Sequence, residues 1–321
     1  MTMLTQRRTL GSPGGYLTPG GQNRAVRVVD VDAHEGPVYL GREDALYFTT
    51  LPRAGRISPV ASVKRLALDG DRFPLETERI AVVDADLIMP NGMVADHDGS
   101  LIVCEQGNPS VPAQLRRLDP RTGVTSTIVD AWHGLRLNSP NDVVVKSDGT
   151  IWFTDPAYGY LQGFRPSPQV GDFVYRCDPV TGSLSVVADS FSKPNGIAFS
   201  PDESVLYVTD SGANQEPGTY HVNLPHHVIA YDVVGGRQLA NQRLFAVTTP
   251  GFPDGIKVDE AGRVYVSSPT GVQVFSPAGD LRGQIDVPGA VNFTFGGADH
   301  NILFITADTA IWAAALDTKG A

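Results

Sequence analysis

A pattern repeated six times along the chain constrains its fold more than any other feature. Each copy opens with a short turn-prone segment and continues as a short apolar run, a turn and a second run of alternating β-forming residues. The copies begin 41 to 59 residues apart, at Glu35, Asn91, Asn141, Asn195, Asp254 and Phe295. A repeat of this length without a helical period predicts a stack of similar β units, because a single unit cannot bury both of its faces.

Turn-forming residues divide each copy into short strands. Asp98-Gly99 and Asp148-Gly149 stand between apolar runs, which is a strong signal for a β-hairpin. A second strand pair follows in most copies, such as residues 173–178 and 184–188, joined by a turn sequence. Four strands per copy predict the blades of an all-β, six-bladed β-propeller. An open solenoid of the same units is the alternative.

The last copy contains only three predicted strands, at residues 292–298, 302–306 and 311–315. We expect residues 25–31, ahead of the first copy, to supply the fourth strand, so that the N-terminal strand closes the last blade and removes a free sheet edge. The predicted organisation is a flexible N-terminal tail over residues 1–24, which are rich in Gly and Pro toward their end, and a single propeller domain over residues 25–316.

Composition and charge narrow the functional classes. The formal net charge is −10 and no basic run extends beyond residues 6–8, so we expect no nucleic-acid partner. No apolar stretch is long enough for a membrane helix and residues 1–8 lack the apolar core of a secretory signal, which favours a cytoplasmic protein without a membrane partner. We expect a monomer or a simple homo-oligomer. Cys104 and Cys177 lie in apolar runs and are expected to be buried, reduced thiols.

Oxygen-bearing side chains converge in the predicted fold. The first strand of a propeller blade lines the central channel, so the residues that open the copies should emerge on one rim. They supply carboxylates from Glu35 and Asp254 and amides from Asn91, Asn141 and Asn195. Any single Asn-Gly or Asp-Gly pair is also ordinary turn chemistry. Glu is a poor turn former in the same slot, so the set favours a binding site.

Carboxylate and amide oxygens are the ligands of a hard cation. Two carboxylates balance a 2+ charge, and the amides add coordination without further charge. We predict one divalent cation, Ca²⁺, with Mg²⁺, Mn²⁺, Zn²⁺ or Fe²⁺ as alternatives, although no His/Cys set has zinc-ligand spacing. Such an ion can polarise a carbonyl group and orient a water molecule.

Longer stretches carry a resemblance to a known family. The chain resembles the gluconolactonase, senescence-marker-protein (regucalcin) and luciferin-regenerating-enzyme family, in its bacterial gluconolactonase branch, over about residues 31–315. The matching stretches are HEGPVY at 34–39, RLNSPNDVVVKSDG at 136–149, FTDP at 153–156, KPNGIAFS at 193–200, PDG at 253–255 and FGGAD at 295–299.

The resemblance implies a six-bladed propeller and metal-dependent hydrolysis of a sugar lactone. It places the cation on Glu35, Asn195 and Asp254, with Asn141 as a fourth metal ligand or a substrate contact. Departures from the family pattern include Gln106, where many members have His, and residues 267–270, where a more Gly-rich stretch is usual. These departures bear on which lactone is the substrate.

The predicted reaction begins with attack of water on a lactone carbonyl polarised by the cation. Asp254 is the predicted general base, and the ring oxygen leaves as an alcohol. Sugar hydroxyls are expected to be held by polar groups near the rim, namely Asn91, Glu105, Arg136, Asn138 and Asp155.

Two other functions are compatible with the same residues. One is a phosphotriesterase of the organophosphate type, or another ester hydrolase, on the same cation site. The other is a non-enzymatic calcium-binding propeller, although a scaffold needs no converging ring of oxygen ligands.

Overall fold

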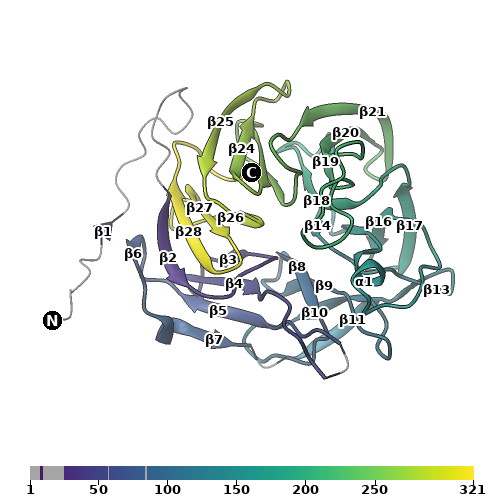
Figure 1. Ribbon diagram of the computed structural model, residues 1–321, viewed down its shortest axis with the longest axis horizontal. Helices are drawn as coiled ribbons and strands as arrows, with labels where there is room; N and C mark the ends of the chain where they lie inside the picture. Colours follow the sequence, from purple (N-terminus) through teal and green to yellow (C-terminus); the bar gives the residue numbers. More distant parts are fainter. Residues whose placement is uncertain (1–7, 10–24, 57, 84) are drawn as a thin grey trace.

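The computed structural model describes residues 8–9, 25–56, 58–83 and 85–321, and its main elements are six four-stranded antiparallel sheets. The sheets follow one another around a central axis in chain order (Figure 1). The innermost strands form a closed ring of neighbours. This arrangement confirms the predicted six-bladed β-propeller.

The strands of each blade run in order from the axis outward. Blades 1 to 3 contain β3 (Val38–Leu40), β4 (Ala45–Thr49), β5 (Val63–Ala67) and β7 (Ile80–Val82); β8 (Pro90–Ala95), β9 (Leu101–Glu105), β10 (Gln114–Leu118) and β11 (Thr125–Val129); and β14 (Val143–Val145), β15 (Ile151–Asp155), β16 (Phe173–Asp178) and β17 (Ser183–Ala188). Blades 4 to 6 contain β18 (Pro194–Phe199), β19 (Val205–Asp210), β20 (His227–Val234) and β21 (Gln238–Val247); β22 (Ile256–Val258), β23 (Val264–Ser268), β24 (Gly271–Phe275) and β25 (Leu281–Asp286); and β26 (Asn292–Gly296), β27 (Ile302–Thr306), β28 (Ala310–Ala315) and β2 (Val26–Asp30).

The N-terminal strand closes the ring as predicted. β2 pairs antiparallel with β28 and forms the outer edge of blade 6, with Val26 opposite Ala313 and Asp30 opposite Ala310. Of the predicted flexible tail, residues 1–7 and 10–24 lie outside the described residues, and β1 (Arg8–Thr9) pairs with β6 (Arg72–Phe73). The domain limits at residues 25 and 316 stay a prediction.

Glycines allow the inner strands to approach one another closely around the axis. A Cβ atom on Gly92 would lie 2.2 Å from the Asn141 carbonyl oxygen, and one on Gly196 would lie 2.4 Å from that of Asp254. These glycines lie within β8 and β18, so the Asn-Gly pairs of the repeat serve packing between blades rather than turns. The hairpin turns instead use glycines with positive φ, such as Gly99.

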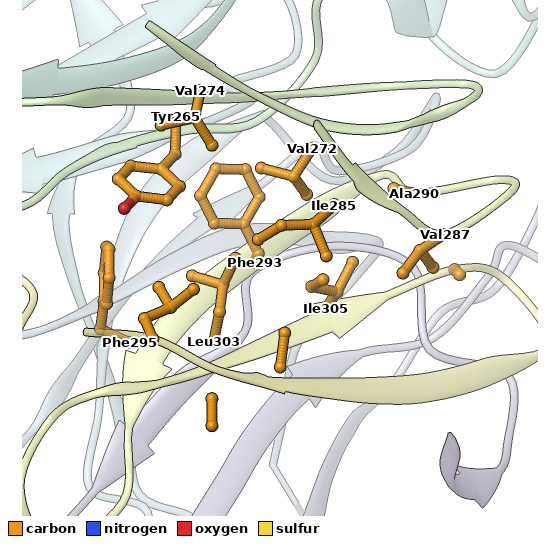
Figure 2. Close-up of a cluster of buried hydrophobic side chains, with 14 residues drawn as sticks. Tyr265, Val272, Val274, Ile285, Val287, Ala290, Phe293, Phe295, Leu303 and Ile305 are labelled. Carbon is orange, nitrogen blue, oxygen red and sulfur yellow. The ribbon is translucent and has the colours of Figure 1, made fainter. Parts of the chain in front are cut away.

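Apolar side chains fill the space between neighbouring blades. Figure 2 shows this packing between blades 5 and 6, where Val272 and Ile285 of one sheet face Phe293 and Leu303 of the next. All four side chains are fully buried. Burial of apolar surface stabilises a fold by about 25 cal/mol per Å². Because each cluster is shared by two blades, the blades stabilise one another.

The remaining elements are short and lie outside the six sheets. They are η1 (Thr77–Arg79), the hairpin of β12 (Ala131–Trp132) and β13 (Leu135–Arg136), and α1 (Tyr158–Leu161), which follows the second strand of blade 3. In the described part of the chain, no helix has the length and apolar character needed to cross a membrane. Cys104 and Cys177 are free and buried, as predicted.

Candidate active site

The residues that precede or begin the inner strands line a cavity at one end of the central channel. The cavity has a volume of about 540 Å³, within the range of small-molecule sites. The structure brings five of the predicted residues together in its lining: Glu35, Asn91, Asn141, Asn195 and Asp254. They come from five different blades, so the ring itself creates the site.

The sixth rim position was predicted wrongly. Phe295 lies within β26 and packs edge-on against Tyr265, with ring centroids 5.4 Å apart, inside the cluster between blades 5 and 6. The rim of blade 6 is formed by Val291, which lines the cavity, and Asn292, whose Nδ2 donates a 2.7 Å hydrogen bond to Glu35 Oε2. The prediction was misplaced because blade 6 has no polar residue followed by Gly at this point, unlike Asn91-Gly92, Asn195-Gly196 and Asp254-Gly255.

Acidic side chains cluster in the cavity wall and beneath it. Burial raises the pKa of the Glu35 carboxyl, and Asp142, which is 1% exposed, raises it further, whereas His34 lowers it. The pKa of Asp254 lies well above its ordinary value because of burial first and the Glu35 and Asp142 charges next. Carboxylates that oppose one another's ionisation in a buried setting are stabilised by a bound cation.

The donor set fits a hard divalent cation. Both hydrogen bonds to the Glu35 carboxylate, from Asn292 and from the Gly36 N–H, fall on Oε2, so Oε1 receives no hydrogen bond from the described residues. The Asn141 Oδ1 atom is buried and accepts no hydrogen bond from any of the described residues. A buried oxygen without a donor is costly unless a ligand satisfies it. No group of three or more His, Cys, Asp or Glu side chains with metal-binding geometry occurs among the described residues, so the predicted site depends on amide oxygens.

Hydroxyl groups of one blade hold the rim backbone of the next. Thr154 Oγ1 donates to the Asn195 carbonyl oxygen at 2.7 Å, and Thr209 Oγ1 donates to that of Asp254 at 2.8 Å. Both hydroxyls belong to the second strand of the preceding blade and are fully buried. The backbone of two candidate ligands is thereby fixed relative to the neighbouring blade.

Two predicted substrate contacts instead anchor loops. Glu105 Oε1 accepts the Ile88 N–H at 2.6 Å, and Asp155 accepts the N–H groups of Asn138 and Ser139 at 2.9 and 2.8 Å. Glu105 and Asp155 are 1% and 0% exposed and neither lines the cavity. Burial raises the pKa of Asp155 to about 8, opposed by its backbone hydrogen bonds. Each carboxylate, at the end of a second strand, fixes the loop that leads into its own blade.

The other two predicted contacts also lie outside the cavity lining. Asn138 is 6% exposed and its Nδ2 donates to the carbonyl oxygens of Asp155 and Gly171. Arg136 is exposed on β13, and its N–H donates to Gln169 Oε1. Of the five residues predicted to hold the substrate, Asn91 is therefore the one that lines the cavity.

Sequence reasoning missed several residues of the cavity wall. His34 and Asp308 both line it and form a hydrogen bond of 2.7 Å between Nδ1 and Oδ1, although 274 residues separate them. Tyr158 of α1 lines it as well. These residues lie outside the repeated strands, so the repeat pattern does not predict their positions. His34 is the exception, because it directly precedes Glu35 and could have been expected near the cavity for that reason.

Comparisons with known proteins place the chain among lactone-hydrolysing relatives. The family model described as SMP-30/gluconolactonase/LRE-like region matches residues 33–309. The gluconolactonase of Zymomonas mobilis is 29% identical over 87% of this chain and 80% of its own length. Lactonohydrolase oryL of Aspergillus oryzae is 31% identical over 85% of this chain, which spans only 65% of that relative. The solved structure of a gluconolactonase from Xanthomonas campestris has a TM-score of 0.76 and 33% identity, covering 97% of this chain and 94% of its own.

Proposed function

This chain belongs to the SMP-30/gluconolactonase/LRE-like family, and we propose that it is a lactonase that hydrolyses a sugar lactone to the open hydroxy acid with the help of one divalent cation. The named lactonases among its relatives support a hydrolase of cyclic esters. The observation that carries the proposal is the cavity in which Glu35, Asn141, Asn195 and Asp254 meet at the centre of the propeller.

These four residues are the proposed cation ligands, and Ca²⁺ is the proposed ion because every donor is an oxygen. The unpartnered Asn141 Oδ1 atom favours a ligand role for Asn141 over a substrate contact alone. When bound, the cation would supply Lewis-acid polarisation of the lactone carbonyl. The Asn292 side chain fixes Glu35 by its hydrogen bond to Oε2, which leaves Oε1 available as a ligand atom.

Asp254 is the proposed general base. Unlike Glu35, which is 3% exposed, Asp254 is only partly buried at the cavity surface, where a water molecule can reach it. Its carboxylate takes a proton from the water that attacks the carbonyl carbon. The acyl–oxygen bond of the ring then breaks, and Asp254 passes the proton that it took from the water to the ring oxygen, which leaves as an alcohol. Asn91 is the proposed contact for a sugar hydroxyl.

A panel of substrates tests this function. Aldonolactones and unsubstituted γ- and δ-lactones are compared with organophosphate triesters under the same conditions. The proposal predicts hydrolysis of lactones with a preference for hydroxylated rings. Faster turnover of phosphotriesters would replace it with the phosphotriesterase alternative, and cation binding without turnover of any ester would favour the calcium-binding propeller.

A further inference from the structure

A short helix contributes a phenol to the cavity wall. α1 follows the second strand of blade 3, and both Tyr158 and Gln162 line the cavity. Gln162 directly follows the helix, and its N–H donates to the Tyr158 carbonyl oxygen at 2.8 Å, so the two residues lie one turn apart. The Tyr158 residue is only 6% exposed, whereas Gln162 is exposed. The phenol is therefore part of the inner wall.

The Tyr158 hydroxyl is buried and forms no hydrogen bond with the described residues. The nearby Ser211 hydroxyl cannot donate to the phenol, because Ser211 Oγ donates its proton to the Pro253 carbonyl oxygen at 2.5 Å. Burial raises the pKa of Tyr158 well above its ordinary value, and the Asp254 charge raises it further. The phenol therefore keeps its proton and can act as a donor.

Buried hydroxyl groups almost always have a partner. Tyr175 is the other tyrosine of the described chain with a buried, unpartnered hydroxyl, and it lies in the apolar cluster around blades 2 and 3, outside the cavity. The Tyr158 hydroxyl differs because it belongs to a side chain that lines a cavity large enough for a small molecule. A ligand with an oxygen at this wall would satisfy it.

We propose that the Tyr158 hydroxyl donates a hydrogen bond to a hydroxyl group of the lactone and thereby selects hydroxylated lactones over hydroxyl-free ones. In the proposed reaction, the lactone carbonyl binds near Glu35, Asn195 and Asp254. The Tyr158 hydroxyl lies on a different element, so it would contact another part of the substrate. This inference rests on the proposed function and adds a specificity-determining residue to it.

Replacement Tyr158→Phe removes only the unpartnered oxygen. D-glucono-δ-lactone and δ-valerolactone share the six-membered ring, but the second has no hydroxyl groups. We expect kcat/KM for gluconolactone to fall about 10-fold, as for one lost hydrogen bond, and kcat/KM for valerolactone to change by less than about 2-fold. The ratio of the two values is the readout, because a structural defect would lower both.

Two matched variants control for the substitution itself. Tyr175→Phe removes a buried, unpartnered hydroxyl outside the cavity, and Tyr160→Phe removes an exposed one from the same helix. Both should keep the wild-type ratio, and melting temperatures of all three variants should match or exceed that of the wild type. An unchanged ratio in Tyr158→Phe, or an equal loss on both lactones, would overturn the inference while the lactonase function stands. A wild-type protein that hydrolyses neither lactone would overturn the proposed function and the inference with it.

Discussion

At the residue scale, the two carboxylates of the cavity have different surroundings. Glu35 is held by Asn292 and by its neighbouring backbone N–H through one oxygen. Asp254 lies at the cavity surface; burial raises its pKa most, the Glu35 charge raises it further and the Asn195 amide lowers it. This difference assigns a fixed ligand role to Glu35 and both metal binding and proton transfer to Asp254.

Replacing Asp254 with Asn separates these two roles. Asn keeps an oxygen ligand of nearly the same shape but cannot accept a proton at neutral pH. We expect the cation to remain bound, more weakly because one negative charge is lost, and kcat to fall about 10²- to 10⁴-fold, as for a lost general base. Single-turnover rates at saturating cation, with metal content measured in parallel, check this result.

The control is Asn195→Asp, which adds a negative charge to the same site. It should retain the cation and lower kcat by making the ion less electrophilic. If Asp254→Asn with confirmed metal occupancy turns over within a few-fold of the wild type, Asp254 is only a ligand. The base would then be sought at His34, whose ring is hydrogen-bonded to Asp308.

At the scale of elements, the second strands of blades 3 and 4 position the rim of the next blade. The hydroxyl of Thr209 in β19 accepts the Gly196 N–H at 2.7 Å and donates to the Asp254 carbonyl oxygen at 2.8 Å. Thr209→Val keeps the shape and removes both bonds. We expect a loss of about 1–3 kcal/mol in the free energy of unfolding, because two buried backbone groups lose their partner, together with weaker cation binding. Urea unfolding and calcium titration measure the two effects.

Blade 1 offers a matched control. Thr49 lies near the end of β4, is also 0% exposed, and its Oγ1 atom has no hydrogen-bond partner among the described residues. Thr49→Val should therefore leave stability unchanged or raise it. Equal destabilisation by both substitutions would contradict the role assigned to Thr209, since the exchange of a hydroxyl for a methyl group would then explain the loss without the hydrogen bonds.

The strands could be predicted from the sequence because the repeat fixes their order and spacing. The prediction of the rim residues was wrong where the repeat pattern is interrupted. Strand bounds in blade 6 were close, yet the rim residue was placed at Phe295 because Val291-Asn292 does not resemble Asn-Gly. Glu105 and Asp155 were expected in the cavity because their strands end on that face. The sequence pattern does not show that both carboxylates accept hydrogen bonds from backbone N–H groups of the adjoining loops, which hold them outside the cavity lining.

Tyr158 shows a second limit of prediction. It lies in a four-residue helix after β15. The spacing of the repeats does not predict where the chain between two strands runs relative to the cavity. Glu35, Asn91, Asn141, Asn195 and Asp254 could be predicted in the cavity because each belongs to the segment that leads into or begins an inner strand. Wall residues depend on loop conformation, which a periodic pattern does not encode.

At the scale of the whole molecule, the ring depends on the pairing of its two ends. Val28 and Val29 of β2 are 0% and 3% exposed and belong to the cluster that joins blades 6 and 1. A chain lacking residues 1–31 would expose the edge of β28, so we expect aggregation or a melting temperature lowered by many degrees. Light scattering and thermal unfolding of the truncated chain check this result.

Point variants in the intact chain make the same test without truncation. Val28→Asp places a charge in the cluster and should strongly destabilise the fold, whereas Arg27→Gln, at a half-exposed neighbour on the same strand, should change stability by less than about 1 kcal/mol. A soluble fragment of residues 32–321 with the wild-type melting temperature would show that the ring closes without β2.

The proposed function depends on a cation held by Glu35, Asn141, Asn195 and Asp254 at the centre of the ring. It is tested by the rate of aldonolactone hydrolysis by the chelated protein as each divalent cation is restored, for the wild type and for Glu35→Gln. We predict that chelation abolishes activity and that Ca²⁺ restores it in the wild type. Glu35→Gln should require a much higher cation concentration, because the site loses one of its two ligand carboxylates. Full activity in the chelated wild type, or the same cation requirement in both proteins, would contradict a catalytic cation at this site.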